Sequence, residues 1–444
     1  MPARGSKNVE LTEAGPLAEG AGVHPQEFGS FPDRDPVWRI QVTRGGLHGF
    51  IPEIYRNLLD CTENSPSAVG SVTWDRAQSR RVARGSTEIL RILLAGGGSG
   101  GSAAPVIAVA EAIAARRSDV EFLYVGTRTG PERVLVEAAG LPFQPVVTGR
   151  LRRYPTWRNV TDPGLVLLGI AQAIDLVHSF RPDVAFGAGG FATVPPLVAA
   201  KISGGKIAIH QQDVVPGLAN RILAPLASLV TVALPETLGR LRGARRVVGN
   251  PVRVAIQSGD GQLGRARLGL DQVLPLVLVT GGGTGAAGLN RIVWEAAHQL
   301  VSDCEIVHLT GDGKGIPGWT HPRYHQIEFL SRDMPHIIAA ADVVVSRAGM
   351  SALAEIAALK KAAIVVPMPS SHQEANAAAL RLHHAAVVRD ELALDADQLV
   401  TEIRSLLGDA SRRAALGDAG AAMLPLTAAN AIAEEILLLV REKV

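Results

Sequence analysis

Residues 91–101, RILLAGGGSGG, place a glycine-rich turn after a short apolar run and before the helix-like stretch 105–116, PVIAVAEAIAAR. Residues 275–286, PLVLVTGGGTGA, repeat this arrangement in front of 289–300, LNRIVWEAAHQL. Glycine lets the backbone approach a ligand closely, and free N–H groups at the start of the following helix attract negative charge. Two matched turns, about one Rossmann domain apart, therefore predict two nucleotide-binding-like halves.

An alternative stays open for each turn, namely that its glycines only tighten the passage from strand to helix. Neither turn reads G-x-G-x-x-G, and neither ends in the G-K-[ST] of a P-loop. A nicotinamide-binding fingerprint and a Walker-type ATP site are therefore poor matches.

Short apolar runs alternate with helical stretches from Arg91 onward. Such runs are typical of parallel strands that are covered on both faces. We expect an α/β fold in which two Rossmann-like domains have parallel sheets that face each other across a cleft. The predicted strands are 92–95, 121–125, 184–188 and 206–209 in the first half, and 276–280, 305–309, 342–345 and 363–366 in the second.

The chain divides into four predicted segments. Residues 1–88 are rich in Gly, Pro, Ser and charge, which predicts a mostly disordered, irregular extension with a short helix near 51–59. Residues 89–253 and 254–425 form the two Rossmann-like domains, with the hinge at 249–253. Residues 426–444 hold a C-terminal helix that can pack on either domain, including back on the first.

Composition narrows the possible functions. With 444 residues, 47% hydrophobic and 19% charged, the chain can bury two large cores, and its net charge of +2 is too small to indicate nucleic-acid binding. The two cysteines, Cys61 and Cys304, offer no disulfide framework or zinc spacing, which suits a reducing cytoplasm. No uninterrupted apolar run reaches about 18 residues, and no signal-peptide pattern opens the chain, so no spanning helix is predicted.

Seven sequence elements, taken in order, resemble the MurG family. These bacterial GT-B glycosyltransferases add N-acetylglucosamine to lipid I and so make lipid II, and the resemblance runs from Ile92 to the C-terminus. The elements are GGGSGGSAAP (96–105), GAGGFATVPPLVAA (187–200), HQQDVVPGLANRILAP (210–225), VVGNPVR (247–253), VLVTGGGTGA (277–286), SRAGMSALAEIAAL (346–359) and VPMPSSHQEANAAAL (366–380).

The resemblance implies an inverting hexosyltransferase of peptidoglycan synthesis, with UDP-N-acetylglucosamine as donor and a lipid-linked diphosphate as acceptor. Such an enzyme contributes to cell-wall biogenesis, cell shape, cell division and the cell cycle, and needs no cofactor. The first domain then binds the acceptor and the membrane, and the second binds the UDP-sugar. No D-x-D pair stands in a glycine-rich turn, so we expect no metal site and activity that persists in EDTA.

On the donor side, the diphosphate needs N–H groups and a cation, and the ribose diol suits a carboxylate. The glycine turn at 281–285 offers the N–H groups, Arg253 offers the cation, and Glu355 lies where the family keeps its ribose-binding glutamate. An ordinary solvated helix face is the alternative for Glu355, and a helix cap is the alternative for Asn376. The donor-binding residues that the resemblance implies are Arg253, Gly282, Gly283, Thr284, Gly285, Glu355, His372, Gln373 and Asn376.

On the acceptor side, the diphosphate is expected to meet the first glycine turn and the start of the helix behind it. The turn at 187–195, GAGGFATVP, supplies a second glycine-rich phosphate-facing segment. The acceptor-binding residues implied are Gly100, Gly101, Ser102, Gly189, Gly190 and Asn220.

Three departures from the family pattern affect the chemistry. Ser102 replaces the usual histidine of the first loop, HQQD replaces HEQN so that Gln211 and Asp213 differ, and GGGTGA replaces GGSQGA. Inverting transfer needs a base for the acceptor hydroxyl, and serine alone is not one at neutral pH. The catalytic candidates are therefore Asp213, His210 and Ser102, although His210 can equally be a core histidine.

Basic and apolar residues alternate between Gly149 and Asp162, where Arg150, Arg152, Arg153 and Arg158 flank Leu151, Tyr154 and Trp157. This pattern indicates contact with an anionic membrane surface, and a basic loop before a core helix is the alternative. The resemblance implies that the attachment is peripheral and at the cytoplasmic face. Two further functions also stay open: a transferase with another acceptor, such as diacylglycerol or a secondary metabolite, and a non-catalytic nucleotide-binding paralogue.

Overall fold

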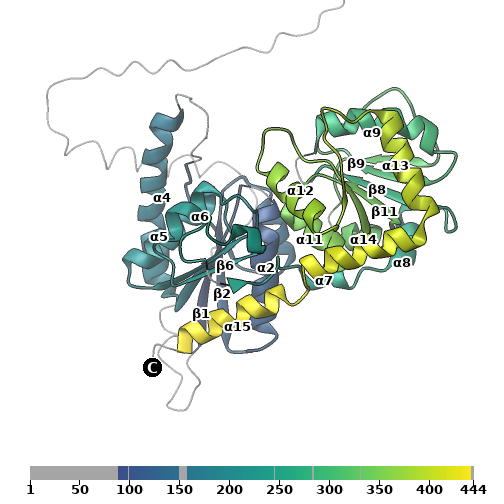
Figure 1. Ribbon diagram of the computed structural model, residues 1–444. Helices are drawn as coiled ribbons and strands as arrows, with labels where there is room; N and C mark the ends of the chain where they lie inside the picture. The colour runs from purple at the N-terminus through teal and green to yellow at the C-terminus, as the bar shows by residue number, and fades with distance from the viewer. Residues whose placement is uncertain are drawn as a thin grey trace, which may run out of the picture. The chain divides into compact units, whose positions relative to one another are not determined.

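The structure is a computed structural model that describes residues 89–98, 100–149, 158–244, 246–282, 285–330 and 332–441. The extension predicted for residues 1–88 lies outside this range. Two parallel α/β units follow each other along the chain, so the predicted α/β fold class is confirmed (Figure 1). Their sheets have seven and six strands.

The first unit alternates strands and helices around a parallel sheet of order β3-β2-β1-β4-β5-β6-β7. Its elements are β1 (Leu90–Ala95), α2 (Gly100–Ala114), β2 (Val120–Gly126), α3 (Glu132–Ala138), β3 (Phe143–Pro145), α4 (Arg158–Phe180), β4 (Val184–Gly187), the 3-10 turn η2 (Phe191–Thr193), α5 (Val194–Ile202), β5 (Lys206–Gln211), α6 (Leu218–Leu223), β6 (Leu229–Val232), η3 (Pro235–Thr237) and β7 (Arg246–Val247).

Side chains alternate across the first sheet, and both faces are buried. Ile92 and Leu94 of β1 pack in the cluster that contains residues of α2, whereas Leu93 and Ala95 pack in the cluster that contains residues of α4 and α5. Figure 1 shows α4, α5 and α6 on one side of this sheet and α2 on the other. Because strands covered on both faces read as continuous apolar runs, the sequence pattern of β1 follows directly from this packing.

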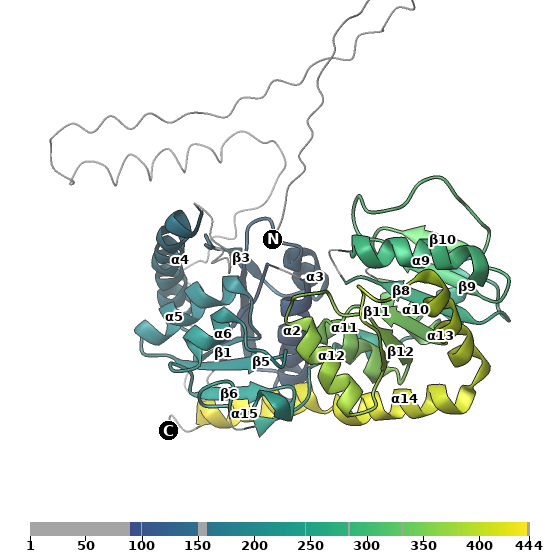
Figure 2. The same ribbon diagram turned by 45° about the horizontal axis from the view of Figure 1, so that its top comes forward.

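The second unit has a parallel sheet of order β10-β9-β8-β11-β12-β13. Figure 2 shows α9 and α13 on the other side of this sheet from α11 and α12. Its elements are α7 (Val254–Gln257), α8 (Gly261–Leu268), β8 (Leu276–Thr280), α9 (Ala287–Leu300), β9 (Glu305–Leu309), β10 (Tyr324–Ile327), α10 (Met334–Ala340), β11 (Val343–Ser346), α11 (Met350–Ala358), β12 (Ala362–Val365), α12 (Gln373–Leu382), β13 (Val387–Val388), α13 (Ala396–Gly408) and α14 (Ala410–Met423).

The last helix, α15 (Ala428–Arg441), packs on the first sheet and not on the second. Its apolar residues Ile432, Ala433 and Ile436 are fully buried in the same cluster as residues of α2 and β1. The ammonium group of Lys206 at the start of β5 donates a hydrogen bond of 2.8 Å to the carbonyl oxygen of Leu439. The chain therefore returns to its first unit after completing the second.

Two helical stretches, 162–180 and 410–441, are long and apolar enough by length and composition to cross a membrane. The sequence criterion of an uninterrupted apolar run did not select them, because charged residues interrupt both. In the structure α4 packs against α5, and α15 packs against α2. Such packing is that of helices that cover the core of a domain.

Candidate functional site

The first glycine turn leads from β1 directly into α2. Gly97 and Gly98 have φ of +157° and +90°, and α2 begins at Gly100. Ser102 lies in the first turn of this helix and is almost fully buried. The hydroxyl of Ser351, from the first turn of α11, donates a hydrogen bond of 2.5 Å to the carbonyl oxygen of Gly101. The first turn of α2 is thus in direct contact with the second unit.

The turn after β4 packs against the first glycine turn. Gly189 and Gly190 have φ of +89° and +86°. A methyl group on Gly190 would lie 2.5 Å from the carbonyl oxygen of Gly97 and 3.3 Å from Cβ of Ser102. Only glycine allows this approach, so two segments that are far apart in sequence form one glycine-lined surface.

His210 lies in the core of the first unit and is fully buried. Its Nδ1 is 3.0 Å from Oγ1 of Thr231, and its Nε2 is 3.2 Å from Oδ1 of Asn250. Burial lowers the pKa of His210 to about 4, although the bond to Asn250 acts in the opposite direction. A buried neutral imidazole with both nitrogens engaged cannot reach a substrate hydroxyl, so the structure favours the core-histidine alternative.

Asn220 also acts inside the first unit. Its amide Nδ2 donates to the carbonyl oxygen of His210 at 3.0 Å and to Oε1 of Gln211 at 2.8 Å, and its side chain is buried. A methyl group on Gly189 would lie 3.4 Å from the same Nδ2. Asn220 therefore ties the loop after β5 to the glycine turn after β4.

Asp213 and Asn376 meet between the loops of the two units. Nδ2 of Asn376 donates to Oδ1 of Asp213 at 2.8 Å and to the carbonyl oxygen of Ala348 at 3.0 Å, and Oδ1 of Asn376 accepts the N–H of Val214 at 3.0 Å. Asn376 lies inside α12 and is fully buried, while His372 occupies the position before the helix, so the helix-cap alternative is wrong. Asp213 remains half-buried, with its carboxylate among these loops.

Arg253 and Glu355 form an ion pair. Nη2 of Arg253, at the start of α7, is 3.0 Å from Oε1 of Glu355 in α11, and the two side chains are only 19% and 13% exposed. Burial raises the pKa of Glu355, and the neighbouring guanidinium group opposes this shift. Nε of Arg253 is buried and has no hydrogen-bond partner. Glu355 is therefore not on a solvated helix face, and the pair retains unused donor capacity.

The second glycine turn runs from β8 into α9, and Gly283 and Thr284 lie outside the described residues. Gly282 and Gly285 have φ of +80° and +67°. A methyl group on Gly285 would clash with the carbonyl oxygen of Thr310, in the loop after β9. This turn is thus pressed against the neighbouring loop at the carboxyl edge of the sheet, where ligands of open α/β sheets bind.

Gln373 begins α12 just after the loop that follows β12. Its Oε1 accepts the N–H of Met368 at 3.0 Å, and both Gln373 and His372 are half-buried. Their side chains remain at the carboxyl edge of the second sheet.

The sequence did not assign a role to Arg347, at the end of β11. Its guanidinium group makes a bidentate pair with Glu391, with two distances of 2.8 Å, and Nη1 also donates to the carbonyl oxygens of Val366 and Pro367. Arg347 therefore fastens the loop that leads to His372. In the sequence, the signal for this ion pair was a basic residue at the end of one strand, Arg347, and an acidic residue after a later strand, Glu391.

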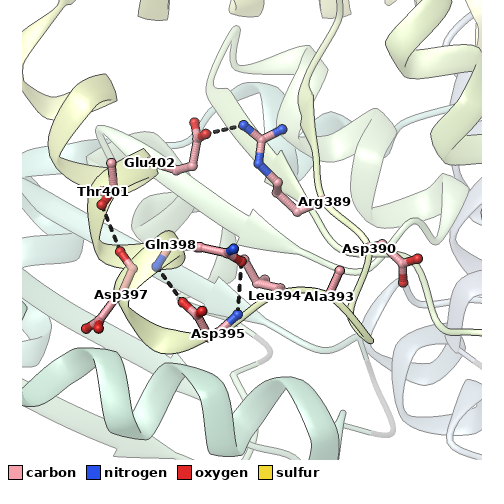
Figure 3. Close-up of a pocket in the computed structure, with 9 residues that line it drawn as sticks. All are labelled: Arg389, Asp390, Ala393, Leu394, Asp395, Asp397, Gln398, Thr401 and Glu402. Carbon is pink, nitrogen blue, oxygen red and sulfur yellow. Dashed lines mark hydrogen bonds and ion pairs between the residues drawn. The ribbon is translucent and has the colours of Figure 1, made fainter.

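Two hollows lie away from the predicted site residues. The larger, about 660 Å³, is lined by residues of β7 and of the α14–α15 connection. The smaller, about 480 Å³, lies at the start of α13, where Gln398 bonds Asp395 and Arg389 pairs with Glu402 (Figure 3). The polar groups of this second hollow are largely engaged with one another. Among the described residues, no group of three or more His, Cys, Asp or Glu side chains is placed to hold a metal ion.

Comparisons with known proteins agree for both units. Residues 92–232 match the glycosyltransferase family 28 N-terminal domain, and residues 276–430 match the family 28 C-terminal domain. The chain is similar to the UDP-N-acetylglucosamine–N-acetylmuramyl-(pentapeptide) pyrophosphoryl-undecaprenol N-acetylglucosamine transferases of Lachnospira eligens and Salinibacter ruber. The first is 34% identical over 72% of this chain and 91% of the relative, and the second is 35% identical over 80% and 98%.

Solved structures support the fold independently. The crystal structure of MurG from Acinetobacter baumannii superposes with a TM-score of 0.58 at 22% identity, over 78% of this chain and 99% of that chain. At this identity the likeness shows the two-domain GT-B architecture. Together with the match of both domains and of full-length relatives, it places the chain in glycosyltransferase family 28, as a UDP-sugar-dependent hexosyltransferase.

Proposed function

We propose that this enzyme transfers N-acetylglucosamine from UDP-N-acetylglucosamine to undecaprenyl-diphosphate-muramyl-pentapeptide, and so converts lipid I to lipid II in peptidoglycan synthesis. The observation that carries the proposal is the buried pair of Arg253 and Glu355, which combines a cation for a diphosphate with a carboxylate for a ribose diol. The names of the relatives from Lachnospira eligens and Salinibacter ruber specify the same donor and acceptor.

The donor occupies the carboxyl edge of the second sheet in this proposal. Glu355 accepts hydrogen bonds from the ribose hydroxyls. Arg253 donates hydrogen bonds to the diphosphate with the N–H groups that Glu355 does not use. The N–H groups at the start of α9 stabilise the negative charge that develops on the leaving UDP. Gln373 and His372, at the start of α12, contact the sugar hydroxyls in this proposal.

Transfer then proceeds in one inverting step. The muramyl hydroxyl of the acceptor attacks the anomeric carbon, the bond from that carbon to the UDP oxygen breaks, and the hydroxyl proton passes to a base. We assign the base to Asp213, because it is a half-buried carboxylate beside Asn376, and because His210 is enclosed in the core. Ser102 and its glycine neighbours serve the acceptor diphosphate.

The membrane-facing surface in this proposal combines the basic segment 150–158 with the start of α4. Residues 150–157 lie outside the described residues. Leu165 and Leu167 follow in α4 and are 39% and 68% exposed. Exposed leucines that follow a cluster of arginines in the sequence suit the interface of an anionic bilayer, which corresponds to a peripheral position at the cytoplasmic face of a bacterial membrane.

A transfer assay with purified protein tests the function. UDP-N-acetylglucosamine and a short-chain lipid I analogue should give the disaccharide product, and UDP-glucose should give much less. Asp213→Asn should lower kcat by about 10²–10⁴ and leave UDP binding unchanged, since loss of a general base acts on the chemical step. Asp183→Asn is the matched control, because Asp183 precedes β4 at the amino end of the strands of the first sheet. Transfer to diacylglycerol but not to the lipid I analogue would contradict the proposal.

A further inference from the structure

The first glycine turn is held from behind by a carboxylate that belongs to a different element. Glu132 is the first residue of α3, and it is fully buried. Its Oε1 accepts the N–H of Thr127 at 2.8 Å and the hydroxyl of the same residue, and its Oε2 accepts the N–H of Gly98 at 3.2 Å. One side chain thus joins the turn that follows β1 to the turn that follows β2.

The surrounding backbone is built to admit this carboxylate. A methyl group on Gly97 would lie 2.5 Å from Oε1 of Glu132, and one on Gly126 would lie 3.3 Å from the same atom. A methyl group on Gly130 would clash with Oε2. These three glycines, from the turn after β1 and from the end of β2 and the turn that follows it, therefore leave the space that Glu132 fills. The Glu132 side chain is thus part of the structure of both turns.

Burial of this carboxylate carries a desolvation cost, which its hydrogen bonds must offset. Within the part of the chain that the structure describes, no lysine or arginine forms an ion pair with Glu132. A buried carboxylate without a cation costs far more free energy than a buried amide. In the second unit an amide joins α9 to the loop after β9: Asn290 donates to the carbonyl oxygens of Thr310 and Lys314, at 2.8 and 3.2 Å.

The position of the carboxylate has two consequences for ligands. It consumes the N–H of Gly98, so that this group is not available to a phosphate, and the outward N–H groups begin at the start of α2. It also fills the space behind Gly97 and Gly98, so that a ligand group cannot enter the turn from that side.

We propose that Glu132 is a positioning residue for the acceptor. By fixing Gly98 it sets the course of the chain into α2, and thereby the placement of Gly100, Gly101 and Ser102 that receive the acceptor diphosphate. The proposal rests on the proposed function in assigning the acceptor to this turn. Glu132 itself does not touch the substrate.

The test compares Glu132→Gln and Glu132→Asp with Asp183→Asn in the full chain. Asp183 is the matched control because its carboxylate also accepts a backbone N–H, that of Arg91 at 2.9 Å, but at the opposite edge of the same sheet. Steady-state kinetics with the lipid I analogue, calorimetric binding of UDP, and hydrogen exchange of the amides at 98–102 are measured for each variant. Hydrogen exchange reports on the turn even if the analogue is not a substrate.

Glu132→Gln should lower kcat/KM for the acceptor by about 10- to 100-fold, since charge-assisted hydrogen bonds to the turn are lost. The Kd for UDP should stay within about twofold, because the hydrogen bonds of Glu132 lie entirely within the first unit. Exchange at 98–102 should accelerate at least about tenfold, and Glu132→Asp should recover part of both losses. Asp183→Asn should change neither acceptor kinetics nor exchange in the turn.

Unchanged exchange at 98–102 in Glu132→Gln would overturn the proposal, as would equal losses for donor and acceptor that Asp183→Asn reproduces. Should Glu132→Gln fail to fold, Thr127→Val removes one donor to the carboxylate and retains the charge. Thr127→Val should give a smaller loss of kcat/KM for the acceptor and a smaller acceleration of exchange at 98–102, with UDP binding unchanged. Absence of turnover by the parent enzyme, together with faster exchange in Glu132→Gln, would refute the assigned acceptor and leave the holding of the turn intact.

Discussion

At the scale of single residues, the site is a set of buried polar pairs. Arg253 with Glu355, and Arg347 with Glu391, are each partly or largely withdrawn from solvent, and both lie on elements of the second unit. Buried charges are tolerated when they are paired, and removal of one partner leaves the other uncompensated. Substitutions in these pairs therefore report on ligand binding only when folding is checked at the same time.

We predict that Glu355→Gln weakens UDP binding by about 10- to 100-fold, because the ribose hydroxyls lose a charged acceptor worth about 1.5–3 kcal/mol. Isothermal titration calorimetry with UDP measures the change. Glu295→Gln, an exposed carboxylate in α9, is the control and should bind as the parent does. An unchanged Kd in a folded Glu355→Gln variant would remove Glu355 from the donor site.

Two buried histidines make stability depend on pH. Burial lowers the pKa of His210 and of His308 to about 4, from an ordinary value of 6.5. Below 6.5 the unfolded chain binds protons that the folded protein does not, so stability falls as the pH is lowered from 6.5 toward 4. Each histidine should contribute about 2 kcal/mol of loss between about pH 6.5 and about pH 5.

Urea unfolding at several pH values checks this expectation. His210→Gln should be less stable than the parent at neutral pH, but its stability should decline less steeply below about pH 6.5. Gln262→Ala, which changes an exposed residue of α8 that carries no titratable group, is the comparison and should leave the slope nearly unchanged. Equal slopes in all three proteins would show that these histidines are accessible in the folded state.

At the scale of elements, the sequence predicted the central strands well. The runs at 92–95 and 276–280 became β1 and β8, because strands covered on both faces must be continuously apolar. The strands it missed are β3, β6, β7, β10 and β13, which have two to four residues each. All lie at or next to a sheet edge. β3, β7 and β10 bury few side chains, whereas β6 and β13 are largely buried but too short to form a distinct apolar run.

The site was predictable in part for a related reason. Glycines in a turn indicate that the backbone approaches another group closely, so the turns at Gly190 and Gly282 could be identified from the sequence alone. The partners of a buried polar group depend on tertiary structure, and His210, Asn376 and Glu132 could not be placed before the fold was known. His210 proved to be a core residue because Thr231 and Asn250 saturate its ring.

We predict that Gly190→Ala damages the acceptor surface. The new methyl group would sit 2.5 Å from the carbonyl oxygen of Gly97, so that two backbone turns must separate. Overpacking of this kind costs about 1–3 kcal/mol in addition to the strain of positive φ. Thermal unfolding and acceptor kinetics should both reveal the change.

Gly204→Ala is a close control for this substitution. Gly204 has φ of +81°, similar to +86° at Gly190, but nothing lies within 4 Å of its added methyl group. It should show the backbone strain alone, with unchanged kcat/KM for the lipid I analogue. If Gly190→Ala behaves like Gly204→Ala in both measurements, the close contact with Gly97 does not shape the acceptor site.

At the scale of the whole molecule, function depends on contacts between the loops that follow the strands of the two sheets. Asn376 binds Val214 and Asp213, and Ser351 binds Gly101, so the acceptor turn and the donor helices share hydrogen bonds. Donor binding at Glu355 in α11 therefore affects the element that also carries Ser351. This arrangement offers a direct physical route by which a bound UDP-sugar can influence the acceptor turn.

Association with the membrane is the last property at this scale. The segment 150–158 should hold the enzyme on anionic vesicles, and the leucines exposed at the start of α4 should enter the interface. Replacement of Arg152, Arg153 and Arg158 by serine should weaken vesicle binding by about 100-fold at low salt, since each basic residue contributes about 1 kcal/mol near an anionic surface. The difference should shrink as salt screens the surface potential.

Sedimentation with vesicles that contain anionic lipid measures this binding at several salt concentrations. The triple replacement of Arg242, Arg291 and Arg381, exposed arginines outside this segment, removes the same charge and should sediment nearly as the parent does. Leu167→Ser should weaken binding without altering its dependence on salt, because it removes apolar contact and leaves the charge. UDP binding should be unchanged in the Arg152, Arg153 and Arg158 variant. If that variant sediments like the parent at low salt, the segment is an ordinary basic loop, and the membrane contact lies elsewhere on the protein.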